Sequence, residues 1–128
     1  MFPEQVKQHF GYLVTDYGFL VSREEERLVE YLSDSCRVEV GLDYYCVVVL
    51  LSSTEPQIIR RTRAELLEVV RHRDPGAMPA VPEAADAYRT DPEGSRERQL
   101  AVFAPLLRQH CDDMLRGDFS AWKNRRRW

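Results

Sequence analysis

Residues 19 to 51 read FLVSREEERLVEYLSDSCRVEVGLDYYCVVVLL, and this stretch decides the fold. It contains four runs rich in apolar and β-branched residues, separated only by short polar or glycine-containing segments. A parallel crossover needs a dozen or more residues, so connections this short join antiparallel neighbours. The stretch therefore predicts a four-stranded antiparallel meander, with strands at residues 19–23, 27–32, 36–40 and 44–51.

The third and fourth runs indicate how the sheet is buried. The third, CRVEV, alternates apolar and charged residues, which predicts one apolar face and one polar face. The fourth, YYCVVVLL, is apolar on both faces, so we expect it in the interior of the sheet or covered on both sides.

A helix is predicted before the sheet, over residues 3–16. Pro3 suits a first helical turn, and Gly18 suits a left-handed C-terminal cap. The apolar residues between them recur at the spacing of one helical face: Val6, Phe10, Leu13, Val14 and Tyr17.

Two further helices are predicted after the sheet. Thr62 to Glu65 matches a capping box for the first of them, which should end at Asp74-Pro75-Gly76. Ser95 is the expected cap of the second, which Pro105 should kink and Gly117 should end. Its apolar stripe consists of Leu100, Phe103, Ala104, Leu107, Cys111, Met114 and Leu115.

The C-terminal segment is predicted to fold back on the domain. Gly117 is suited to a left-handed conformation, and Asp118 or Ser120 to capping a following turn, which would bury Phe119 and Trp122. Residues 124–128 are expected to form a mobile tail. Residues 74–94 are expected to be an irregular, proline-rich segment with one short helix at Pro82 to Tyr88.

Together these patterns predict a single α+β domain over residues 1–128. The four-stranded meander is flanked by the N-terminal helix and by C-terminal helices, and the N-terminal helix and the last long helix are expected on one face.

The composition is that of a water-soluble domain. The chain has 128 residues, of which 44% are hydrophobic and 30% charged. The longest apolar run, residues 44–51, is too short to cross a bilayer, and the N-terminus shows no secretory signal, so a cytoplasmic location without membrane contact is expected. Cys36, Cys46 and Cys111 are interpreted as buried free thiols, and no spacing favours zinc.

Charge is unevenly distributed along the chain. Residues 1–58 carry ten acids and four bases, whereas residues 59–128 carry fourteen bases and eleven acids. This asymmetry favours an acidic face on the side of the sheet. Nucleic-acid binding is not expected from Arg60, Arg61, Arg63 or residues 125–127, because the whole chain is acidic and no nucleic-acid motif surrounds them.

The residues proposed for an interface are Glu24, Glu25, Glu26, Tyr44 and Tyr45. Tyr44 and Tyr45 are adjacent in a predicted strand and should point to opposite faces, so one of them should be exposed. Exposed tyrosine beside acids is a frequent composition of protein interfaces.

No catalytic residue, cofactor or metal is assigned. The histidines His9, His72 and His110 are not paired with one another or with a recognisable nucleophile. The alternative to an interaction protein is a small enzyme or ligand-binding domain, with a pocket between sheet and helices and with His9, His110 and Tyr45 as its best groups. A structural homodimer is the third interpretation.

Three segments carry a resemblance: Tyr17 to Phe19, Val38 to Tyr44, and Leu115 to Trp122. In these segments and in the order of its elements, the chain resembles small uncharacterised bacterial proteins, some of them similar to immunity proteins of toxin–immunity systems. The resemblance implies a non-enzymatic protein that binds and occludes a protein partner. It assigns no functional residue.

Overall fold

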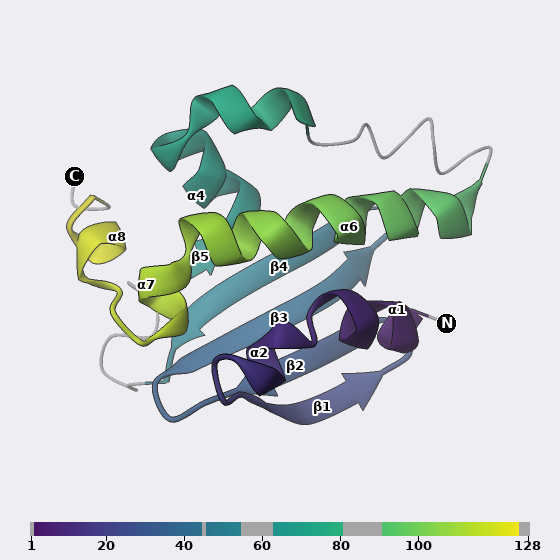
Figure 1. The fold of residues 1–128 in the computed structure, drawn as a ribbon, viewed down its shortest axis with the longest axis horizontal. Coiled ribbons are helices and arrows are strands. Elements are labelled where there is room, and N and C mark those ends of the chain that lie inside the picture. The colour runs from purple at the N-terminus through teal and green to yellow at the C-terminus, as the bar shows by residue number, and fades with distance from the viewer. Residues whose placement is uncertain (1, 45, 55–62, 81–90, 126–128) are drawn as a thin grey trace.

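The computed structural model describes residues 2–44, 46–54, 63–80 and 91–125 (Figure 1). An open antiparallel sheet of five strands, in sequential order, forms one layer of the structure. The predicted four-strand meander is confirmed, and a very short fifth strand joins it. The strands are β1 (Leu20–Glu25), β2 (Leu28–Leu32), β3 (Cys36–Asp43), β4 (Cys46–Ser53) and β5 (Ala64–Glu65).

Strand β3 is the central strand of the sheet, with β2 and β1 on one side of it and β4 and β5 on the other. Val40 lies opposite Val29 and Val49, and all three side chains are buried. The predicted alternation of β3 is confirmed, since its burial changes at every residue from Cys36 to Val40. On β4 one face is buried, whereas Val48 and Leu50 on the other are half-buried.

The predicted helix over residues 3–16 is wrong in one respect: it is two helices, α1 (Phe2–His9) and α2 (Tyr12–Thr15). The break falls at Gly11, the residue type with the lowest helix propensity after proline. Phe10 and Leu13 are both buried in the core, whereas Val14, predicted on the buried stripe, is 42% exposed. The left-handed conformation predicted for Gly18 is confirmed by its φ of +76°.

The remaining helical elements follow the sheet. They are α4 (Leu66–Arg73), the 3-10 helix η1 (Pro75–Ala80), α6 (Pro92–His110), α7 (Asp112–Leu115) and α8 (Ser120–Arg125). The segment predicted to be irregular therefore contains η1 and the first turn of α6. The short helix predicted at Pro82 to Tyr88 lies outside the described residues.

Two predicted helix caps are wrong. The predicted cap Thr62 lies outside the described residues, and α4 is capped by Glu65, whose carboxylate accepts the N–H groups of Leu67 (2.9 Å) and Glu68 (3.3 Å). Helix α4 cannot begin earlier because Ala64 and Glu65 are paired with β4. Asp91, not Ser95, caps α6, since its carboxylate accepts the N–H of Gly94 at 3.0 Å.

Ser95 has a structural role inside α6. It is buried and accepts a hydrogen bond of 3.3 Å from Nε2 of Gln99, whose Oε1 accepts the backbone N–H of Val47 at 2.8 Å. These bonds fasten α6 to the start of β4. The prediction of one helix from Ser95 to Gly117 is wrong: α6 continues on both sides of Pro105 but ends at His110, and α7 begins after Cys111.

Helices α1 and α6 lie side by side over one face of the sheet, as predicted (Figure 1). Helix α4 contacts both α6 and β4. The core fills the space between these helices and the sheet, and every residue of the predicted α6–α7 stripe is buried in it. Cys36 and Cys111 are buried free thiols, as predicted, whereas Cys46 is half-buried.

The fold-back of the C-terminal segment is confirmed. Gly117 has a φ of +94°, and Oδ1 of Asp118 accepts the N–H of Ser120 at 3.0 Å. Phe119 is 4% exposed and Trp122 is 1% exposed. The predicted tail begins too early, because α8 continues through Arg125; residues 126–128 lie outside the described residues.

Candidate protein-interaction surface

Two turns of the meander meet at one end of the sheet, because Leu28 in β2 lies opposite both Glu25 in β1 and Gly41 in β3. Arg27 links them: its Nη2 donates to the carbonyls of Leu42 (3.0 Å) and Tyr44 (3.4 Å). We call Glu24, Glu25, Glu26, Arg27, Asp43 and Tyr44 the turn rim. Four of the five predicted interface residues therefore lie together; the fifth, Tyr45, lies outside the described residues.

Tyr44 is the most unusual residue of the turn rim. Its side chain is 80% exposed, and its φ of +54° places it in the left-handed region. Among the residues described, it is the one non-glycine residue with a positive φ. That conformation costs an L-residue about 1–2 kcal/mol. The predicted strand position of Tyr44 is wrong: Asp43 pairs with Cys46, so Tyr44 lies in the short turn between β3 and β4, where a positive φ is usual.

The acidic charge of the turn rim is partly compensated. Glu24 lies 2.8 Å from Nζ of Lys7, and Glu25 lies 2.6 Å from Nε of Arg23. The Arg23 hydrogen bond lowers the pKa of Glu25, so this carboxylate stays ionised. Both pairs are solvent-exposed, and exposed ion pairs contribute little to stability, so a partner can exchange them readily.

A cavity of about 310 Å³ extends the turn rim towards the helical layer. Glu26, Arg27 and Leu42 line it from the sheet, and Phe2, Glu93 and Arg96 line it from the first turns of α1 and α6. The rim is therefore continuous with a hollow of mixed charge.

Strand β1 contributes Glu24 and Glu25 to the turn rim, and it is the first strand at the edge of the sheet formed by the described residues. All six of its residues are exposed. Leu20 is 71% exposed and Val21 is 39% exposed, while Glu24 and Glu25 lie at the other end of the strand. The pairing with β2 is irregular between Val21 and Arg23.

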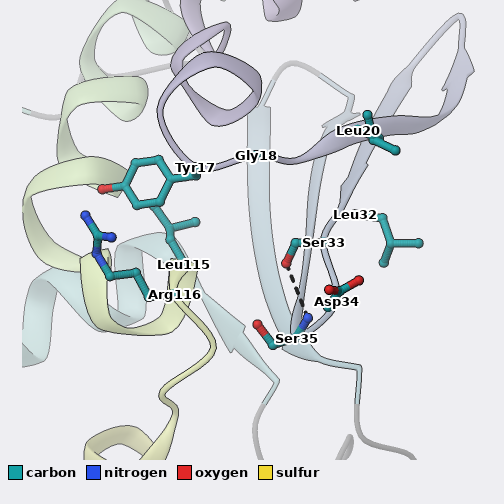
Figure 2. A pocket seen from close by; sticks show the side chains of 9 residues that line it. All are labelled: Tyr17, Gly18, Leu20, Leu32, Ser33, Asp34, Ser35, Leu115 and Arg116. Atoms are coloured by element: carbon teal, nitrogen blue, oxygen red, sulfur yellow. Dashed lines mark hydrogen bonds between the residues drawn. The ribbon is translucent and has the colours of Figure 1, made fainter.

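A second cavity, of about 430 Å³, lies at the start of β1. Figure 2 shows Tyr17 and Arg116 on one side of it, and Leu20, Leu32 and the turn formed by Ser33, Asp34 and Ser35 on the other. We call it the Tyr17 pocket. Its size falls within the range of small-ligand and side-chain sites, which is about 300–1,000 Å³.

The helical side of the Tyr17 pocket is held by polar contacts. The Tyr17 hydroxyl donates to Asp112 at 2.5 Å, and Nε of Arg116 donates to the same carboxylate at 3.1 Å. These two bonds lower the pKa of Asp112. The Arg116 guanidinium also lies 5.1 Å from the centre of the Tyr17 ring, within cation–π range. This wall is thus fixed in place.

The structure does not bring His9 and His110, the histidines of the alternative enzyme interpretation, together. His9 contacts the carboxylate of Glu97, near the start of α6. His110 is the last residue of α6, so the two sites are separated by thirteen residues, or about 20 Å along the helix. Nε2 of His110 lies 3.5 Å from the Asp74 carboxylate.

Within the described residues, His, Cys, Asp and Glu do not form a group of three that could hold a metal ion. Among the helices of that same part of the chain, none is long and apolar enough to cross a membrane.

Comparison of the chain with protein-family models, with curated proteins and with the solved structures found no match.

The sequence did not single out Leu20, Val21 or the residues of the Tyr17 pocket. Leu20 and Val21 read as ordinary strand residues, and their exposure follows from the position of β1 at the edge of the sheet. A sequential meander must leave its first strand at an edge, and that is the one signal from which these residues could have been found.

Proposed function

We propose that this chain is a non-enzymatic protein-binding domain that acts by occluding a protein partner, in the manner of an immunity protein. The observation that carries the proposal is the turn rim. It presents an 80% exposed tyrosine, held at a positive φ, beside a cluster of acids. Aromatic anchors of this kind carry much of the binding energy in protein interfaces.

Charge supports a partner with a basic surface. The half of the sequence that forms the sheet has ten acids and four bases. The ion pairs Lys7–Glu24 and Arg23–Glu25 are exposed and weak, so basic groups of a partner can replace them. Complementary charge of this kind accelerates encounter and selects the partner.

The proposal is tested by placing a photo-crosslinking amino acid, p-benzoylphenylalanine, at position 44 of the full chain. The matched control carries it at Gln109, an exposed residue of α6. Irradiation in an extract of the native host should give an adduct of defined mass from position 44 and not from position 109. The product of any neighbouring toxin gene is the first protein to examine in that adduct.

The captured protein is then purified and titrated with the chain by calorimetry. Tyr44→Ala and Glu26→Lys should each weaken binding by tenfold or more, whereas Gln109→Lys should leave it unchanged. A chain that gives no adduct at position 44, or equal adducts at both positions, would contradict the proposal.

A further inference from the structure

Among the residues that the structure describes, none pairs with the outer edge of strand β1. It is the first strand in a sheet whose order is sequential, so β2 pairs with only one of its two edges. An edge strand presents unpaired N–H and C=O groups, which form a template for a further strand. Natural proteins usually protect such edges with charges and bulges, and β1 has both, in Arg23, Glu24 and Glu25 and in the irregular pairing between Val21 and Arg23. The start of the strand lacks this protection, because Leu20 is 71% exposed and Val21 is 39% exposed.

The side chains of β1 divide it into two halves. Leu20 and Val21 are apolar, and Glu24 and Glu25 are acidic. Leu20 lies opposite Leu32 and lines the Tyr17 pocket, so an apolar side chain of an added strand has a hollow beside it. An added strand that fits this edge therefore carries apolar residues at one end and basic residues at the other.

A second copy of the chain fits the same edge poorly. If two β1 strands paired antiparallel along their full length, Leu20 would lie opposite Glu25 of the other copy, and Val21 opposite its Glu24. Each apolar side chain would then face a carboxylate. The pattern favours a different protein as the occupant.

We propose that β1 binds an extended segment of a partner protein as an additional strand of the sheet, with apolar residues beside Leu20 and Val21 and basic residues beside Glu24 and Glu25. This inference rests on the proposed function and specifies how the partner binds. Main-chain hydrogen bonds supply affinity in this mode of recognition, and the side chains supply specificity.

Arg23 does not prevent a basic segment from binding. It is paired with Glu25 at 2.6 Å, but it also lies opposite Glu30 in β2, and the charges of Glu30 and Glu39 act on it as well. Arg23 can therefore turn towards Glu30 and Glu39 when a basic side chain of the partner pairs with Glu25.

The probe is the blocked peptide Lys-Lys-Glu-Thr-Val-Leu, whose residues match those of β1 in antiparallel order. It is titrated to millimolar concentration into the isotope-labelled full chain, and binding is followed by NMR. We expect saturable shifts in residues 20–25 and in Tyr17. The charge-reversed peptide Glu-Glu-Lys-Thr-Val-Leu should bind at least tenfold more weakly. Leu20→Asp and Glu25→Lys, both at exposed positions, should each weaken binding of the first peptide tenfold, while Gln109→Lys should not.

The backbone is tested with two peptides that are N-methylated at alternate amides. Only one of the two sets faces β1 in an added strand, so one methylated peptide should lose binding and the other should keep it. No saturable binding, or equal effects of the two methylation patterns, would overturn the inference.

Light scattering tests whether a second copy of the chain binds the β1 edge instead. A mass of two chains that Leu20→Asp reduces to one chain would assign the edge to a second copy and would also overturn the inference. A crosslink at position 44 without peptide binding to β1 would leave the proposed function standing and reject only this mode of binding.

Discussion

Gly117 occupies a position that no other residue fits. Its φ is +94°, and a Cβ atom there would lie 2.3 Å from Oγ and 2.6 Å from Cβ of Ser35. Gly117 thus lets the end of α7 touch the β2–β3 turn.

Gly117→Ala is expected to lower the free energy of unfolding by about 2–4 kcal/mol, from backbone strain and the steric clash together. Thermal unfolding followed by circular dichroism measures this loss of stability. Gly18→Ala is the matched control, because Gly18 has a φ of +76° but nothing within 4 Å of an added Cβ. Adding Ser35→Gly to Gly117→Ala should restore part of the loss. Equal losses in the two alanine variants would show that contact with Ser35 is unimportant.

Tyr44 is expected to reduce stability in exchange for binding. Tyr44→Gly removes the cost of a left-handed L-residue, about 1–2 kcal/mol, and adds the smaller entropic cost of glycine. The melting temperature should therefore rise by about 2–4 °C while partner binding is lost. A fall of the melting temperature by several degrees would mean that the Tyr44 ring stabilises the fold.

Tyr31 should make the protein sensitive to alkali. Its side chain is 1% exposed, and its hydroxyl has no hydrogen-bond partner among the residues described. Burial raises the pKa of Tyr31 to about 12, and the nearby charge of Glu24 adds to the rise. The Tyr31 hydroxyl therefore ionises at about pH 10 in the unfolded chain but only at about pH 12 in the folded protein. Its contribution to the free energy of unfolding is fully present below pH 10 and is lost as the pH rises towards 12.

Tyr31→Phe should raise the melting temperature slightly at pH 7, because it removes an unpaired buried hydroxyl. It should also reduce the loss of stability between pH 10 and 12. Melting curves from pH 7 to 12 measure both effects. Part of the loss should persist, since burial raises the pKa of the Cys36 and Cys111 thiols to about 12 as well. An unchanged alkaline profile would exclude Tyr31 as a cause.

At the scale of the elements, local signals predicted where strands and helices lie, but not that both long predicted helices are divided, near Gly11 and at Cys111. The alternation in β3 and the apolar stripe of α6 arise because their side chains face one core. The spacing of apolar residues in the sequence therefore predicts them directly. The break at Gly11, the strand β5 and the cap at Glu65 were not predicted. They depend on distant partners: Glu65 can cap α4 only because β4 holds the two residues of β5.

The candidate surface was predicted only in part, because it also depends on contacts between residues far apart in the sequence. Composition grouped Glu24 to Glu26 with Tyr44, but their adjacency depends on hairpin register and on Arg27. The exposure of Leu20 depends on strand order, which periodicity does not report.

Helix α8 should contribute strongly to stability despite its six residues. Trp122 is 1% exposed, and its ring lies 6.0 Å from that of His72 in α4, in an edge-to-face arrangement. Trp122→Ala should cost about 3–5 kcal/mol and lower the melting temperature by about 10 °C. Ala121→Ser, at an exposed neighbouring position, is the control and should change it by no more than about 1 °C. Equal effects would mean that α8 is not docked in solution.

Across the whole molecule, stability should decrease from the centre of the sheet to its first edge. Strand β3 is paired on both sides, whereas β1 is exposed throughout. Hydrogen exchange measured by NMR should therefore be slowest at Val38 and Val40 and at least a hundredfold faster for alternate amides of β1. Uniform protection of β1 would indicate that its edge is already paired in the free protein.

The chain order of the two layers has a consequence for biosynthesis. The meander is complete at Ser53, but α6, which covers it together with α1, begins only at Pro92. A nascent chain therefore presents much of the apolar face of its sheet before the covering helix has been made. Such exposed faces are where chaperones act and aggregation begins. The production of this protein is thus most vulnerable to aggregation in the interval before α6 has emerged and docked on the sheet.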